Sequence, residues 1–203
     1  MRRSLSTIAS LVAIVALPAS ALGHAPSVID TSTDSAADAV ILEDPTLSRA
    51  IGATIDQPGE IDWYRMDLAA GDPLIVGTTA PDATGGIATT FTLLGPGLPA
   101  ADLSGPEAAA RAAEVGVDGA IVFEPAADPP REVHGGLGFI NYGSLRLEAP
   151  ADGSYWVALT AVDPAATGKY VFAPGLREEF GLDAIGGMRD LIEFFRAPWP
   201  PAD

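Results

Sequence analysis

Residues 62–71 have the sequence DWYRMDLAAG, in which apolar and polar side chains alternate from Tyr64 to Leu68 before a glycine turn. Alternation with a period of two is typical of a β-strand with one buried face. The same pattern recurs in GSYWVAL at residues 153–159 and in GKYVF at residues 168–172. We therefore expect these strands to share one core. The side chains predicted to build it are Tyr64, Met66, Leu68, Tyr155, Val157, Leu159, Tyr170 and Phe172.

Further strands are indicated by the same alternation between turn residues. They are predicted at residues 50–55, 74–79, 88–94, 119–123 and 144–148. After a turn, the strand at 74–79 is expected to return antiparallel to the strand at 61–68. The sequence EAAARAAE at 107–114 favours a short helix, because Ala, Glu and Arg are good helix formers. The segment 124–138 is rich in Pro and Gly and is predicted to be a long loop.

The hydrophobic period changes near the C-terminus. Apolar residues recur there at steps of three and four: Leu182, Ile185, Met188, Leu191, Ile192 and Phe195. This spacing predicts an amphipathic helix, which we expect to lie on the sandwich; a membrane surface or a partner protein is the alternative. The predicted fold class is all-β, a mostly antiparallel, jelly-roll-like β-sandwich with an added C-terminal amphipathic helix.

The N-terminus has the features of a secretory signal peptide. Basic residues at positions 2–3 precede an apolar run at 8–17 and small residues at 19–21. The run is too short for a stable membrane span, which needs about 20 apolar residues, although an uncleaved anchor is the alternative. The predicted organisation is a signal peptide at 1–23, a flexible leader at 24–43, a sandwich domain at 44–176 and a helical segment at 177–203. The expected location is secreted or periplasmic.

The composition of the chain excludes several classes of function. The 203-residue chain has a formal net charge of −16 and no cysteine. The missing thiols exclude cysteine catalysis, iron–sulfur clusters and cysteine zinc sites. Strong negative charge repels phosphate backbones and anionic lipid surfaces, so nucleic acid is not an expected partner.

The strand signatures resemble those of the bacterial pre-peptidase C-terminal domain, which has an Asp-x-Tyr-x-Phe-x-Leu-x-x-Gly strand, a later Gly-x-Tyr-x-x-x-Val strand and a final Gly-x-Tyr. Here the matching residues are Asp62, Tyr64, Met66, Leu68, Gly71, Gly153, Tyr155, Leu159, Gly168 and Tyr170, with Met66 in place of Phe. The resemblance covers roughly residues 50–80 and 145–173. It implies a jelly-roll-like sandwich with an accessory binding role, and binding of collagen or calcium in some members.

Two tryptophans are candidate binding residues. If Tyr64 and Tyr155 face the core, strand parity turns Trp63 and Trp156 to the outer faces. Exposed aromatic rings form platforms for sugar rings and prolines. The alternative is that the C-terminal helix or the middle segment covers them.

Metal binding is a further hypothesis. Cleavage after Gly23 would make His24 the N-terminal residue, whose amine and imidazole together chelate copper, with His134 as the second ligand. Oxygen ligands for calcium are also present around the turns that flank residues 61–68. They are Asp56, Glu60, Asp67 and Asp72.

The evidence for catalysis is weaker. His134-Gly135-Gly136 is similar to an esterase oxyanion loop, but the chain has no G-x-S-x-G nucleophile elbow. We therefore predict an exported, non-enzymatic binding or accessory module whose extracellular ligand is a glycan, a protein surface or a divalent cation. A copper protein using His24 and His134, and a secreted hydrolase, are the alternatives.

Overall fold

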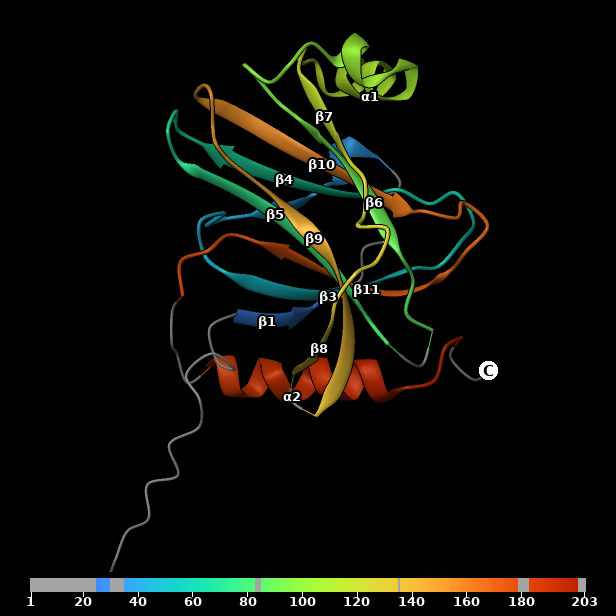
Figure 1. Ribbon diagram of the computed structural model, residues 1–203. Coiled ribbons are helices and arrows are strands. Elements are labelled where there is room, and N and C mark those ends of the chain that lie inside the picture. The colour runs from blue at the N-terminus through green and yellow to red at the C-terminus, as the bar shows by residue number, and fades with distance from the viewer. Residues whose placement is uncertain (1–24, 30–34, 83–84, 135, 179–182, 201–203) are drawn as a thin grey trace, which may run out of the picture.

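The computed structural model describes residues 25–29, 35–82, 85–134, 136–178 and 183–200. In these residues two β-sheets pack face to face, with strand orders β1-β3-β11-β5-β9-β8 and β2-β4-β10-β6-β7. Helices α1 (Pro106–Val115) and α2 (Asp183–Arg196) lie on opposite sides of the sandwich (Figure 1). The structure confirms the predicted all-β sandwich with a C-terminal helix.

The six-stranded sheet contains β1 (Ala25–Val28), β3 (Arg49–Ile55), β11 (Gly168–Pro174), β5 (Pro73–Pro81), β9 (Leu137–Glu148) and β8 (Arg131–His134). The five-stranded sheet contains β2 (Val40–Leu42), β4 (Asp62–Leu68), β10 (Gly153–Ala161), β6 (Thr89–Leu94) and β7 (Ala120–Phe123). Two short 3-10 turns complete the described elements, at Ala36–Asp38 and Ala101–Ser104.

Eight of these strands form a jelly roll. Strand β3 pairs with β11, β4 with β10, β5 with β9 and β6 with β7, which is the pairing of one long hairpin rolled into two sheets. Successive strands along each arm therefore alternate between the sheets. The predicted pairing of 61–68 with 74–79 is wrong for this reason: the turn between β4 and β5 carries the chain from one sheet to the other.

The predicted flexible leader at 24–43 also needs correction. Strand β1 pairs in parallel with β3, and β2 pairs in parallel with β4, so each adds an edge to one sheet. Leu42 is 5% exposed and belongs to the core between the sheets. The sandwich therefore begins before residue 44. Strands of three and four residues are too short to show a clear alternation. The predicted signal peptide lies outside the described residues.

The predicted long loop at 124–138 contains a strand. Residues Arg131–His134 form β8, which pairs antiparallel with the start of β9. Strand β9 itself runs over 12 residues, with an irregularity at Tyr142, where Thr78 faces Gly143 and Thr79 faces Asn141. This extra residue reverses the alternation along β9, which explains why the sequence indicated only its second half.

The predicted core is confirmed. Tyr64, Tyr155 and Tyr170 are all 0% exposed, and the ring of Tyr64 stacks on Phe172 with centroids 4.0 Å apart. The other predicted core side chains are also buried between the sheets. Three polar groups are buried among them: the Tyr64 and Tyr170 hydroxyls lie 2.7 Å apart, and Tyr170 donates to Oδ2 of Asp62 at 2.5 Å.

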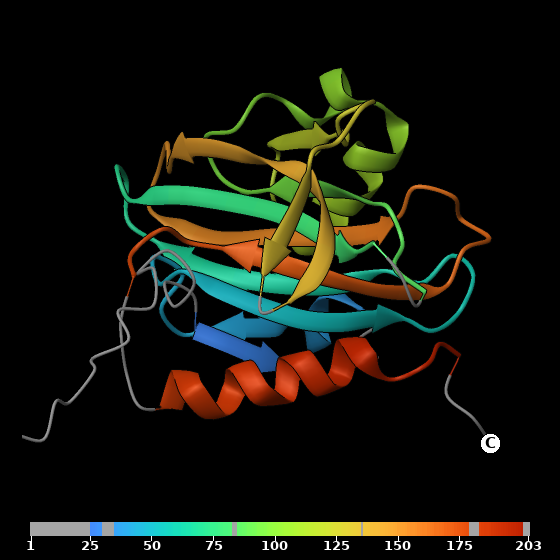
Figure 2. The same ribbon diagram turned by 60° about the horizontal axis from the view of Figure 1, so that its bottom comes forward.

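Helix α2 packs on the outer face of the six-stranded sheet, close to β1 and β3 (Figure 2). Two glycines permit the close approach. A Cβ on Gly52 would lie 2.6 Å from Leu191 Cδ1, and a Cβ on Gly187 would lie 2.2 Å from the Pro26 carbonyl oxygen. Gly187 therefore fits the helix to the sheet, although glycine weakens a helix locally. Among the described residues no helix is long and apolar enough to cross a membrane.

The C-terminal end of α2 is held by Lys169, the only lysine of the chain. Lys169 is 2% exposed, and its Nζ donates to the carbonyl oxygens of Phe194 at 2.5 Å and Ala197 at 2.6 Å. The Nζ also lies 5.0 Å from the centroid of the Phe194 ring. A cation is favourable here because the last carbonyls of a helix carry partial negative charge. The helix therefore lies on the sandwich, which was the expected one of the two alternatives.

Replacing Lys169 with methionine is expected to loosen the end of α2. The substitution leaves two carbonyl oxygens without their charged donor, which costs about 2 kcal/mol of stability. Amide hydrogen exchange should then become faster in the last turn of α2 than in β11. Arg189→Met is the matched control, because Arg189 is exposed on the same helix and pairs with Glu193 one turn away. Equal exchange in wild type and Lys169→Met would show that Lys169 does not hold the helix.

Candidate functional site

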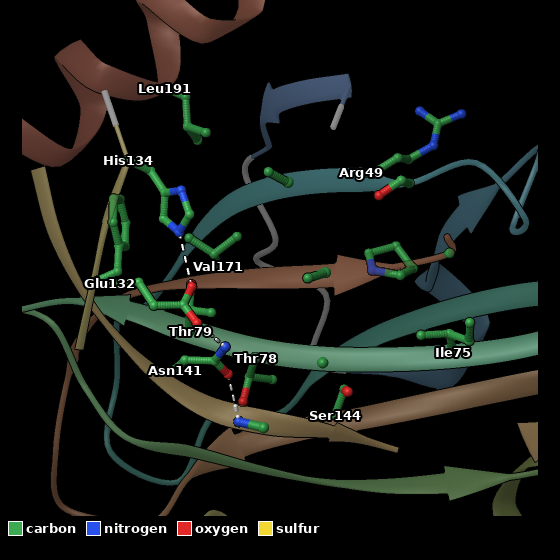
Figure 3. A pocket seen from close by; sticks show the side chains of 18 of the residues that line it. Arg49, Ile75, Thr78, Thr79, Glu132, His134, Asn141, Ser144, Val171 and Leu191 are labelled. Atoms are coloured by element: carbon green, nitrogen blue, oxygen red, sulfur yellow. Dashed lines mark hydrogen bonds and ion pairs between the residues drawn. The ribbon is translucent and has the colours of Figure 1, made fainter. Parts of the chain in front are cut away.

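A cleft of about 270 Å³ lies between α2 and the outer face of the six-stranded sheet (Figure 3). We call it the α2 cleft. Its roof consists of side chains on one face of the helix: Met188, Leu191, Ile192 and Phe195. Its floor is formed by residues of the six-stranded sheet, and the apolar ones come from β3, β5, β11 and β9: Ala50, Ile75, Gly77, Val171, Ala173, Leu137 and Phe139.

Small side chains on the floor leave space for the cleft between the sheet and α2. Ala173 of β11 faces Gly77 of β5, which in turn faces Ser144 of β9. A Cβ on Gly77 would lie 3.1 Å from both the Gly143 carbonyl oxygen and Ser144 Cβ, so the sheet has little room for a larger residue there. On one side of this row Val171 faces Thr79 and Thr79 faces Asn141; on the other side Ile75 faces Arg146. The floor is thus apolar in the centre and polar along β9.

Three polar side chains of the β8–β9 hairpin lie at one end of the α2 cleft (Figure 3). Oε1 of Glu132 accepts a hydrogen bond from Asn141 Nδ2 at 2.8 Å, and Oε2 lies 2.9 Å from His134 Nε2. The hydrogen bond from His134, followed by the one from Asn141, lowers the pKa of Glu132. The carboxylate is therefore ionised at neutral pH, and this end of the cleft carries negative charge.

The other end carries arginine. Arg49 lies away from His134 across the cleft in Figure 3, and its Nε is buried without a hydrogen-bond partner among the described residues. Arg146 lines the same cleft and donates from Nε to Ser144 Oγ at 3.1 Å. Thr78 lies toward the Asn141 side in Figure 3, and its buried hydroxyl is also without a partner in the described part. The α2 cleft thus has an anionic end, an apolar middle and a cationic end.

The unpaired arginines are unusual in so acidic a chain. Over the described ranges, five arginines form ion pairs with carboxylates: Arg65, Arg111, Arg131, Arg177 and Arg189. Arg49, Arg146 and Arg196 do not, and the first two of these line the α2 cleft. Unpaired charge in a partly enclosed site favours a ligand of opposite charge.

The predicted tryptophan platform is wrong for Trp63. Both tryptophans face away from the core, as the parity argument predicted, but Trp63 is only 1% exposed. It packs in a second apolar cluster with Ala108 and Ala112 of α1, so the middle segment covers it. Trp156 is half-buried beside the same cluster, with Arg65 Cζ 5.9 Å from its ring centroid.

The metal hypotheses have different outcomes. His24 lies outside the described residues, so the copper site formed with His134 stays a prediction. Within the described ranges there is no group of three or more His, Cys, Asp or Glu side chains that could hold a metal ion. Three of the suggested calcium ligands are used inside the protein instead. Glu60 accepts from the amides of Asp56 and Gln57, Asp72 accepts from the amide of Ala69, and Asp67 pairs with Arg65.

Most residues of the α2 cleft were missed from sequence. Arg49 was placed just before a strand, Arg146 was one polar position in a strand, and Glu132 was in a predicted loop. The available signal was the outward parity of Arg146 on β9. Glu132 lies on β8 and Arg49 begins β3, and only the order of strands in the sheet places the three around one cleft. His134 was singled out as a copper ligand, and that role stays a prediction; its partner here is Glu132.

Topology and cleft define the class of this protein as a jelly-roll β-sandwich with a helix-covered cleft on one outer face. No family model matches the chain, and no curated protein matches it. Similar solved structures include CorA, a surface-associated copper-binding protein important in Methylomicrobium album BG8 copper acquisition. The TM-score is 0.36 at 10% sequence identity, over 73% of this chain and 100% of that chain. A likeness of this size carries no argument about function.

Proposed function

We propose that this protein is an exported, non-enzymatic binding module that holds a small, largely apolar molecule in the α2 cleft. The observation that carries the proposal is the cleft itself, a concave site with an apolar roof and floor and a few polar groups at its ends. Sites for small molecules have this composition, because apolar walls supply affinity and a few polar groups fix orientation.

The floor and the roof of the α2 cleft are held by the rest of the fold, which favours a preformed binding site. Its floor belongs to the jelly roll, and its roof is held by Lys169 beneath the last turn of α2. Leu176, at the rim, is 55% exposed, and a bound apolar molecule would cover part of that surface. A volume of about 270 Å³ is near the lower bound of typical ligand sites. It suits a small molecule better than a glycan chain or a protein surface.

Export is proposed from the signal-peptide features of residues 1–23. N-terminal sequencing of protein recovered from the culture medium or the periplasm is expected to give a chain that begins after residue 21, 23 or 25. Metal analysis of the same sample tests the copper alternative, since only cleavage after Gly23 would place His24 at the N-terminus. Recovery of the uncleaved chain in the cytosol would contradict export.

Filling the floor of the α2 cleft is expected to abolish binding. Nile red, a neutral apolar dye, should bind the wild-type protein with a rise in fluorescence. Ala173→Trp places a large ring on the floor beneath α2 and should weaken dye binding about tenfold or more. The matched control is Ala127→Trp, because Ala127 is an exposed alanine in the segment between β7 and β8.

The same titration includes a thermal melt of each variant. If the Ala173→Trp variant is folded and binds Nile red as tightly as wild type, the dye binds outside the cleft, which contradicts the proposal. Loss of binding in Ala127→Trp alone would do the same. Wild-type protein that does not bind the dye at all would show that the cleft does not take apolar molecules.

A further inference from the structure

We infer that the ligand of the α2 cleft is a single-chain amphiphile with a carboxylate head, whose head group binds Arg49 and whose apolar chain lies between α2 and the sheet. The inference rests on the proposed function and adds the charge of the ligand and its direction in the cleft.

The first step of the inference concerns the hydrogen bonding of Arg49. Its Nε is buried yet has no hydrogen-bond partner among the described residues, and the guanidinium has no ion pair there. A buried donor left without an acceptor costs about 1–3 kcal/mol, and more when it is charged. A carboxylate satisfies such a donor well, because guanidinium and carboxylate form paired hydrogen bonds. Arg49 is thus the group in this cleft with most to gain from an anionic ligand.

The second step is the contrast between the two ends. Glu132 holds negative charge at the hairpin end, and both of its oxygens are already hydrogen-bonded, to Asn141 and His134. An anionic head placed there would be repelled. At the opposite end Arg146 adds a second positive charge, which forms no ion pair with any of the described residues. The charges of the cleft therefore fix the direction of the ligand.

The third step is the length of the floor. Asn141 and Arg146 face Thr79 and Ile75 of β5, which are four residues apart, so the floor between them is about 13 Å long at roughly 3.3 Å per residue. An extended ten-carbon chain advances about 1.25 Å per bond along its axis, so it is about 11 Å long and fits within this length. Between these residues the roof offers Leu191 and Ile192, and the floor offers Val171. A chain of this length would lie against apolar side chains over most of its course.

The fourth step is the charge of the whole molecule. At a formal net charge of −16, the protein repels anions over long distances. A preference for an anionic over a neutral ligand of the same length must therefore arise from local positive charge. Comparing an anionic ligand with a neutral ligand of the same length therefore tests whether the arginine end of the cleft binds the head group.

The experiment is calorimetric titration of the full exported chain with decanoate and with decanol, at physiological salt, together with the Nile red titration. Decanoate is expected to bind wild-type protein about tenfold or more tightly than decanol. Arg49→Gln should remove this difference, because decanoate binding should weaken much more than the binding of decanol or Nile red. Arg146→Gln should reduce the difference less, because Arg146 is exposed. Arg65→Gln, on the other sheet, is the control and should change nothing.

The outcomes separate the two proposals. If Nile red binds but decanoate and decanol bind equally, or if Arg49→Gln keeps the preference for decanoate, the anionic amphiphile is wrong and the apolar site stands. If none of the three binds wild-type protein, both proposals fail. Arg49→Gln removes no described hydrogen bond, so it should fold. A thermal melt checks this, and Arg146→Gln still tests the arginine end if it does not.

Discussion

Replacing Tyr155 with alanine is expected to lower the free energy of unfolding by about 3–5 kcal/mol. Tyr155 is 0% exposed, and it lies on β10, which pairs with β4 on one side and β6 on the other. The variant loses the apolar contacts of the ring and leaves a cavity between the sheets. A loss of this size is a large fraction of the stability of a single domain, so the variant should be partly unfolded at 37 °C.

The hydroxyl of Tyr155 contributes separately. It lies 2.8 Å from the Ala151 carbonyl oxygen and 3.0 Å from that of Pro96, and so joins the turn before β10 to the turn after β6. Tyr155→Phe should therefore cost about 1 kcal/mol. Urea unfolding followed by circular dichroism measures both variants, with Val162→Ala, which lies just after β10 and is 46% exposed, as the control. An unchanged midpoint for Tyr155→Ala would contradict the packing of the two sheets around this ring.

The sequence was informative wherever a strand shows regular alternation. Tyr64, Tyr155 and Tyr170 were assigned to one core because a period of two fixes which face of a strand is buried. The helix at the C-terminus followed from the change of period in the same way. These features are local, since each depends on residues within a few positions of one another.

Strand pairing was not accessible from the same pattern. Strands β4 and β5 are joined by a short turn, and a hairpin would give them the same alternation that the jelly roll does. What decides between the two is that β10 and β2 occupy both edges of β4. The pairing of β4 with β10 depends on residues about ninety positions apart, so it cannot be predicted from residues 62–79 alone.

The candidate site was less accessible still. Arg49 attracts no notice in the sequence, because an arginine before a strand is ordinarily solvated. It becomes significant only when five other arginines of the described ranges are seen to have carboxylate partners, while Arg49 lines the α2 cleft without one. The tryptophans show the converse: Trp63 was noticed because it faces outward, but α1, some forty residues later in the chain, covers it.

High pH is expected to destabilise the protein steeply, through the two tyrosines buried with Asp62. Burial, with the negative charge of Asp62 next, raises the pKa of Tyr64 well above its ordinary value of 10.0. Burial, with the charges of Tyr64 and Asp62 next, raises the pKa of Tyr170 well above the same value. Both therefore keep their protons in the folded protein at pH values where the unfolded chain has lost them.

The sign follows from proton linkage. Below about pH 10 both states hold these protons, and the contribution of the tyrosines to stability is complete. Above about pH 10 the unfolded state binds fewer protons, so the free energy of unfolding falls by about 1.4 kcal/mol per pH unit for each tyrosine, or about 2.7 for the pair. Lys169 acts in the opposite sense, because burial lowers its pKa and stability gains from it as pH rises toward 10.5. The steep fall should therefore appear above that pH.

Tyr64→Phe tests the origin of this fall. The variant removes one of the two coupled hydroxyls and keeps the ring stacked on Phe172, so the slope of stability against pH should decrease by about half. Tyr142→Phe is the control, since burial raises the pKa of Tyr142 less strongly and its effect on the slope should be smaller. Urea unfolding between about pH 9 and pH 12 gives the slopes. Equal slopes in wild type and Tyr64→Phe would show that the buried pair does not set the alkaline limit of the fold.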